Sequence, residues 1–156
     1  MIMDRLMVAI ATGLYTGRIP FAPGTWGSIF ALIPWYFCRN LALAHYLIVL
    51  AAIFVVGFFT AGSVEKILDQ ADPGCIVIDE ILGVFIALTL APNHPAAWVL
   101  GLALFRVFDI LKPFPVSWFD TRMHGGIGIM MDDVMAGIYA LACLQLIWLF
   151  IGKFFI

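Results

Sequence analysis

The chain has 156 residues, of which 64% are hydrophobic and only 12% are charged. Soluble domains contain about 45–50% apolar and about 25% charged residues, so this composition indicates a protein embedded in a membrane. The net charge of −2 and the lack of a Lys/Arg run argue against nucleic acid as a partner. The length fits one domain covering residues 1–156.

The first expected element, residues 3–17, is a helix lying in the membrane interface. Two prolines and a glycine within residues 20–24 predict a loop, and a short apolar helix follows over 26–37. Residues 41–62 contain no Asp, Glu, Lys or Arg. At 1.5 Å per residue they predict a helix that spans the roughly 30 Å hydrocarbon core.

The apolar segment 76–111 is too long for one crossing and is interrupted by Pro92 and Pro95. It therefore predicts two helices, over 77–91 and 96–112, each short enough to need tilt or local thinning of the bilayer. Residues 127–152 predict the last helix. The expected fold is all-α, an integral membrane bundle of short or tilted helices.

If the helices near 26–38, 41–63, 77–91, 96–112 and 127–152 each cross once, most basic residues lie on one side. The positive-inside rule makes that side cytoplasmic. All ten acidic residues also lie on this side or at helix ends that face it, although the rule does not depend on them. The sequence thus predicts a multi-pass membrane protein with its polar site at the cytoplasmic interface.

Four groups of polar residues converge on that interface. They are Asp79-Glu80; Arg106 with Asp109 and Lys112; Asp120 with His124 and two glycines; and Asp132-Asp133. Any one acidic pair could simply stabilise a helix N-terminus. Four such groups within apolar sequence favour a functional site, because ionisable residues at membrane depth are costly.

Clustered carboxylates coexist when a divalent cation, protons or basic residues neutralise them. Ligation by oxygen alone favours Mg²⁺, Mn²⁺ or Ca²⁺ over Zn²⁺, and Mg²⁺ is the usual partner of a phosphate substrate. Arg106, Lys112 and Arg122 could bind such an anion. The Pro-Gly-Thr loop with Gly24, Thr25 and Ser28 could do so too, although Pro-Gly-Thr alone is a common turn. The residues alone therefore predict metal-dependent chemistry on an anionic ligand.

Five blocks in a fixed order are similar to the phosphatidylglycerophosphatase A family. They are Pro-Gly-Thr-Trp-Gly-Ser (23–28), Ile-Val-Ile-Asp-Glu-Ile-Leu-Gly (76–83), Phe-Arg-Val-Phe-Asp-Ile-Leu-Lys-Pro-Phe-Pro (105–115), Trp-Phe-Asp (118–120) and the His-Gly-Gly block with Asp-Asp (124–137). The resemblance implies a Mg²⁺-dependent lipid phosphatase of the bacterial inner membrane. Its substrate would be phosphatidylglycerol phosphate, and its products phosphatidylglycerol and inorganic phosphate.

The working hypothesis assigns a role to each candidate residue. Asp79, Glu80, Asp132 and Asp133 would hold Mg²⁺, with Asp109 as a further ligand or orienting group. Gly24, Thr25, Ser28, Arg106 and Lys112 would bind the phosphoryl oxygens. His124 would be the general acid for the leaving oxygen, unless it only caps the last helix. The nucleophile, water or an aspartate, is left open.

Three other functions make different demands on these residues. A cation or proton transporter component also uses carboxylates within helices, but a relay needs ionisable groups along the full membrane depth, and the outer helix halves carry none. A scaffold with a solvated acidic face would tolerate the loss of any one carboxylate. A headgroup transferase is a third option, although the Asp-x₂-Asp-Gly-x₂-Ala-Arg pattern of CDP-alcohol phosphotransferases is absent.

Overall fold

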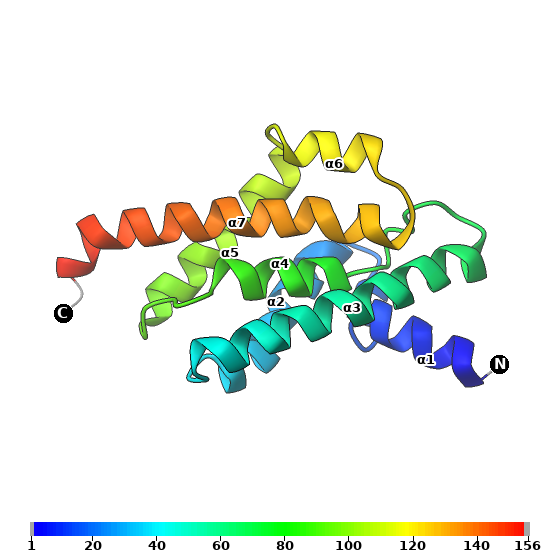
Figure 1. Cartoon of the computed structure of the whole chain (residues 1–156), viewed down its shortest axis with the longest axis horizontal. Coiled ribbons are helices and arrows are strands. Elements are labelled where there is room, and N and C mark those ends of the chain that lie inside the picture. Colours follow the sequence, from blue (N-terminus) through cyan, green and yellow to red (C-terminus); the bar gives the residue numbers. More distant parts are fainter. Residues whose placement is uncertain (1, 155–156) are drawn as a thin grey trace.

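The computed structural model describes residues 2–154, which form helices joined by turns and loops, with no strand among them. The predicted all-α class is therefore confirmed. The elements, shown in Figure 1, are α1 (Ile2–Ala11), α2 (Pro23–Cys38), α3 (Leu43–Leu68), α4 (Ile78–Ala87), α5 (Pro95–Leu111), α6 (Val116–Arg122) and α7 (Gly125–Ile151), with 3₁₀ turns at Thr16–Arg18 and Gly152–Phe154.

Helices α3 and α7 are long and apolar enough to cross a membrane. They have 26 and 27 residues, which makes each about 40 Å long, more than the roughly 30 Å hydrocarbon core. They correspond to the predicted helices 41–62 and 127–152. The sequence located them because a long apolar run, interrupted in α7 only by Asp132 and Asp133, is the strongest signal that a membrane helix gives.

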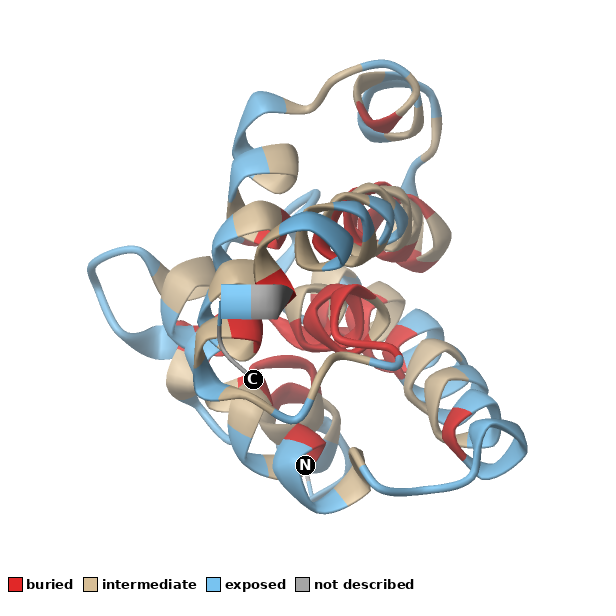
Figure 2. Cartoon of the chain, turned by 90° about the vertical axis from the view of Figure 1, so that its left-hand side faces the viewer, coloured by how far each residue is buried: buried red, intermediate tan, exposed pale blue. Residues whose placement is uncertain are grey.

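Helix α4 is the buried centre of the protein, and α2, α3, α5 and α7 pack around it. Seven of its ten residues are buried, and Figure 2 shows buried residues gathered at the centre while the outward faces are exposed. At about 15 Å, α4 covers only half of a hydrocarbon core. The helix predicted over residues 77–91 is therefore shorter than expected, since it ends at Ala87.

The reason lies at the end of α4, where the chain turns while it is still apolar. Leu90 has a positive φ of 54°, which ends the helical path. The side-chain amide of Gln145 on α7 donates to the carbonyls of Thr89 and Leu90, both at 3.2 Å. Irregular backbone is tolerated within a membrane protein when its polar groups are satisfied in this way.

Three further boundaries differ from the predictions. Helix α1 ends at Ala11 and not near residue 17, because Gly13, Leu14 and Tyr15 all have positive φ. Helix α2 starts at Pro23, three residues earlier than expected, since proline is well suited to the first position of a helix. Helix α6 lies between the predicted helices 96–112 and 127–152, where the sequence analysis predicted no helix.

Glycines set how closely the long helices approach. A Cβ at Gly126 of α7 would lie 2.1 Å from the carbonyl oxygen of Phe58 on α3, and one at Gly137 would lie 2.7 Å from the carbonyl oxygen of Gly83 on α4. Such backbone proximity requires small residues. Helix α4 packs along α7, and its start lies beside the first turns of α7 (Figure 1).

Candidate active site

The candidate site lies where α2, α4 and α7 begin and α5 ends. Asp79 and Glu80 occupy the first turn of α4, and Asp133 lies in the first turns of α7. Arg106 and Asp109 lie in the last turns of α5. The site also includes Gly24 at the start of α2. The structure thus brings together residues from four helices, although Gly24 and Asp133 are 109 positions apart in the sequence.

Three carboxylates form the centre of the site. Asp79, Glu80 and Asp133 each place one oxygen so that the three oxygens lie within 4.8 Å of one another. Asp79 Oδ1, Glu80 Oε2 and Asp133 Oδ2 are buried and have no hydrogen-bond partner within the described part of the chain. Three negative charges at this separation repel each other strongly, and unpaired burial is costly. The trio therefore requires positive charge or protons.

Arg106 supplies part of that positive charge. Its Nη1 lies 2.6 Å from Asp109 Oδ2 and 3.8 Å from Glu80 Oε1. The same nitrogen donates a longer bond of 3.4 Å to Ser28 Oγ. The Arg106–Asp109 pair joins positions i and i+3 of α5, which lie on one helical face. Asp109 is thus positioned to orient Arg106 beside the carboxylate trio.

The first turn of α2 packs directly against this centre. A Cβ at Gly24 would lie only 2.2 Å from Glu80 Oε1 and 3.1 Å from Arg106 Nη1. Ser28 is fully buried, and its hydroxyl donates to the Gly24 carbonyl at 2.7 Å. Thr25 lies in the same turn, and its backbone N–H donates to the Ala22 carbonyl. Gly24 and Ser28 therefore contact the centre, whereas a role for Thr25 in phosphate binding stays a prediction.

Lys112 holds the other edge of the site. Its ammonium group pairs with Asp120 of α6 and, at 2.9 Å, with Asp132 Oδ2 of α7. Asp132 Oδ1 also accepts a bond from the Asp133 backbone N–H at 3.0 Å. Of the four residues predicted to bind metal, Asp132 alone lies outside the close trio. Its carboxylate is instead engaged by Lys112.

A cavity of about 150 Å³ opens above these groups and is called here the carboxylate cavity. Its charged lining residues are Asp72, Asp79, Glu80, Asp109, Lys112, Asp132 and Asp133. Asp72 and Gly74, from the loop between α3 and α4, also line it and were not selected from the sequence. Their Asp-Pro-Gly order predicts a turn, but nothing in the sequence indicates that this turn covers the site.

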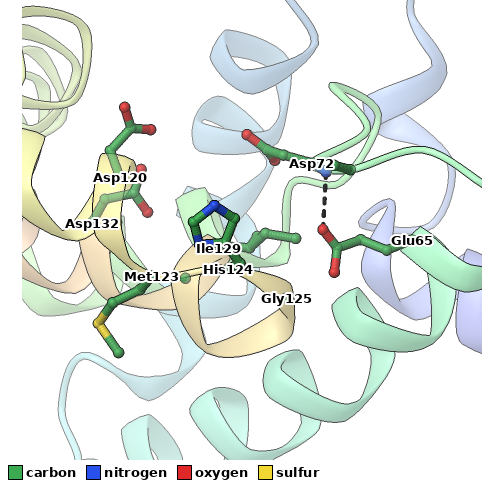
Figure 3. A pocket seen from close by; sticks show the side chains of 10 residues that line it. Glu65, Asp72, Asp120, Met123, His124, Gly125, Ile129 and Asp132 are labelled. Atoms are coloured by element: carbon green, nitrogen blue, oxygen red, sulfur yellow. Dashed lines mark hydrogen bonds between the residues drawn. The ribbon is translucent and has the colours of Figure 1, made fainter.

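His124 lies in a neighbouring hollow of about 110 Å³, the His124 hollow, shown in Figure 3. His124 is exposed and immediately precedes α7. Asp72, Ile129 and Asp132 line both this hollow and the carboxylate cavity, so the two adjoin. The structure therefore places His124 beside the carboxylate cavity and not among the residues that line it.

The rim of the His124 hollow is held by a bond between a loop and α3. Glu65 Oε1 accepts from the Asp72 backbone N–H at 3.0 Å, drawn as a dashed line in Figure 3. The pKa of the Asp72 carboxyl is raised above its ordinary value, first by partial desolvation and further by the nearby charges of Asp120 and Glu65, while Lys112 opposes the shift. Negative charge thus accumulates in this hollow as well.

The donor set of the trio fits a hard divalent cation. All of its candidate ligand atoms are carboxylate oxygens, which Mg²⁺, Mn²⁺ and Ca²⁺ prefer, whereas Zn²⁺ sites use nitrogen and sulfur. Each of the three side chains also carries a buried oxygen without a hydrogen-bond partner, so an ion bound among them would offset a cost of their burial. Arg106 and Lys112 stand on either side with positive charge for an anion. The arrangement is therefore suited to phosphate chemistry.

Comparison with known proteins identifies the family. The family model described as phosphatidylglycerophosphatase A matches residues 9–148. A phosphatidylglycerophosphatase A of Escherichia coli is 37% identical over 139 residues, which cover 88% of this chain and 81% of that protein. Its counterpart in Haemophilus influenzae is 43% identical over 133 residues, covering 84% and 82%.

A third relative, from Bacteroides thetaiotaomicron, bears a different name. It is described as a candidate phosphatidylinositol-3-phosphatase and is 39% identical over 143 residues, covering 86% of this chain and 89% of the relative. No solved structure matches the chain. The chain belongs to the phosphatidylglycerophosphatase A family, as its sequence blocks indicated, and it is a phosphatase.

Proposed function

We propose that this family member is a Mg²⁺-dependent enzyme that hydrolyses phosphatidylglycerol phosphate to phosphatidylglycerol and inorganic phosphate. The observation that carries the metal dependence is the set of three buried, unpartnered oxygens from Asp79, Glu80 and Asp133. The names of the Escherichia coli and Haemophilus influenzae relatives support the substrate. The reaction would complete phosphatidylglycerol synthesis.

The proposed mechanism assigns one step to each group of residues. Asp79, Glu80 and Asp133 would hold Mg²⁺, which when bound neutralises the phosphate and activates water for attack. Arg106, already oriented by Asp109, would donate to the phosphoryl oxygens and stabilise the charge that develops on them. These contacts would position the phosphorus atom at the metal.

The remaining residues would bind another phosphoryl oxygen and protonate the leaving oxygen. Lys112, which lines the carboxylate cavity, would bind a phosphoryl oxygen while Asp120 and Asp132 keep it in place. Hydrolysis breaks the bond between phosphorus and the glycerol oxygen, and that oxygen then needs a proton. His124, in the adjoining hollow, would supply it as the general acid.

The proposed location is the bacterial inner membrane, with several crossings and the site facing the cytoplasm. The two long apolar helices and the bacterial relatives support association with a membrane. The basic residues Arg5, Arg18, Lys66, Lys112 and Arg122 fall on the side of the carboxylate site in the predicted topology, which supports the orientation. A site at that depth would let the headgroup reach the carboxylates while the acyl chains stay in lipid.

The decisive experiment is phosphate release by the purified protein in detergent micelles, with Mg²⁺ or with EDTA. Phosphatidylglycerol phosphate and phosphatidylinositol 3-phosphate should be compared side by side, because the relatives bear both names. We expect Mg²⁺-dependent release and preference for the former lipid. Folded protein that releases phosphate from neither lipid with Mg²⁺ present would overturn the proposal, and preference for the latter would overturn the substrate.

A further inference from the structure

A third hollow lies between α3 and the start of α7 and is called here the α3–α7 hollow. It measures about 450 Å³, and its lining includes Phe58, Phe59, Ser63 and Lys66 of α3 with Gly126 and Ile127 of α7. It is three times as large as the carboxylate cavity, and His124 is the only one of its lining residues that the mechanism above uses. Its lining is mainly apolar with one cation, Lys66, one anion, Glu65, and a few polar groups, as is typical of a ligand site.

The three hollows adjoin one another in series. Glu65, His124 and Gly125 line both the α3–α7 hollow and the His124 hollow. Asp72, Ile129 and Asp132 in turn line both the His124 hollow and the carboxylate cavity. The three hollows therefore form a series from a face of α3, past His124, to the cavity that the three carboxylates line.

The chemistry of the lining changes along this series. At its outer end, Phe58 and Phe59 are 37% and 62% exposed on a helix long enough to cross a membrane. Lys66, also exposed, follows about two turns further along α3. The adjacent Glu65 carboxylate is engaged by the Asp72 backbone N–H. The order from outside to inside is apolar surface, cation, His124 and carboxylates.

We infer that the α3–α7 hollow binds the diacylglycerol half of the lipid substrate, with the phosphodiester at Lys66 and the acyl chains against Phe58 and Phe59. This inference rests on the proposed function. The occupant follows from charge complementarity and from continuity with the catalytic site. In phosphatidylglycerol phosphate, a phosphodiester and a second glycerol separate the terminal phosphate from the acyl-bearing glycerol, which matches the order of groups along the three hollows. Phosphatidic acid lacks both the phosphodiester and the second glycerol.

The test compares Ser63→Trp, which fills the hollow, with Ile48→Trp, a matched control. Ile48 is 64% exposed on the same helix, about four turns away from Ser63. Each purified variant would be assayed on long-chain phosphatidylglycerol phosphate and on its water-soluble deacylated analogue. We expect Ser63→Trp to lose about tenfold or more in kcat/KM on the lipid while its kcat/KM on the soluble analogue stays at the wild-type value.

A second variant, Lys66→Gln, keeps the inference falsifiable if the bulky substitution disturbs folding, because an exposed lysine is not needed for packing. We expect its KM for phosphatidylglycerol phosphate to rise about three- to tenfold with kcat unchanged. The ratio of its kcat/KM on that lipid to its kcat/KM on phosphatidic acid should therefore fall. Retention of wild-type lipid kinetics by both Ser63→Trp and Lys66→Gln would overturn the inference and leave the proposed function standing. Wild-type protein that is inactive on every lipid would overturn the proposed function, and the inference with it.

Discussion

Replacing Gly24 by alanine should damage the catalytic centre without weakening the fold. The new Cβ would lie 2.2 Å from Glu80 Oε1, so the carboxylate must retreat by about 1.2 Å to reach the 3.4 Å of ordinary contact. That oxygen ends a side chain, so the fold can absorb the shift, and alanine is the better helix former. A displacement of about 1 Å in a catalytic constellation costs about a hundredfold, so kcat/KM should fall by about that factor, or about 2.7 kcal/mol.

The assay combines phosphate release with thermal unfolding in detergent, with and without Mg²⁺. Bound Mg²⁺ should stabilise the wild-type protein, by about 2.7 kcal/mol at a hundred times its Kd, and should stabilise Gly24→Ala much less at the same concentration. Gly74→Ala is the matched control, because Gly74 lines the same cavity but a Cβ there meets nothing within 4 Å. Wild-type activity and Mg²⁺ stabilisation in Gly24→Ala would refute the reasoning.

Three further predictions concern the charges and the helix crossing. Asp79→Asn or Asp133→Asn should abolish turnover and stabilisation by Mg²⁺. The metal-free variants should melt no lower than the wild type, since one of the mutually repelling charges has been removed. Measurable turnover in both variants would contradict the metal site. Lys112→Gln should raise KM about tenfold with less than about 1 kcal/mol lost in unfolding free energy, because its ion pairs are partly exposed; an unchanged KM would exclude a phosphate contact. Gly126→Ala should lower the unfolding free energy by about 1–3 kcal/mol, because the new Cβ would lie 2.1 Å from the Phe58 carbonyl oxygen. Gly62→Ala should melt as the wild type does, because its Cβ would lie 3.4 Å from the nearest atom, the Gly126 backbone nitrogen.

The long helices could be predicted because their signal is local. A long apolar run predicts α3, and another, which contains only the two charged residues Asp132 and Asp133, predicts α7. The length of α4 could not be predicted in this way, since residues 88–91 are as apolar as the helix they follow. It depends on Gln145, more than 50 positions away, which satisfies the carbonyls where the chain turns. Such a tertiary contact leaves no mark in the local pattern.

The candidate site was predictable in its members and less so in its geometry. Acidic residues within apolar sequence identified the three carboxylates that the structure brings together. Helical geometry could also have indicated that Asp132 and Asp133 differ, because neighbouring helical residues point about 100° apart. Which of them faces the centre depends on Lys112, which engages Asp132 from another helix. The covering turn at Asp72 had no such signal.

The charge balance of the carboxylate cavity constrains what the protein can bind and in which order. Six acidic residues and Lys112 line the cavity. Arg106 adds a second positive charge nearby, because it forms ion pairs with Glu80 and Asp109. A phosphate monoester would bring further negative charge into a poorly solvated space, where like charges repel more strongly than in water. We therefore expect cations to bind before or together with the phosphate. A scaffold would gain nothing from such an excess of negative charge around a cavity. A transport relay would need ionisable groups in the outer part of α7, but residues 134–151 contain none of Asp, Glu, Lys, Arg or His.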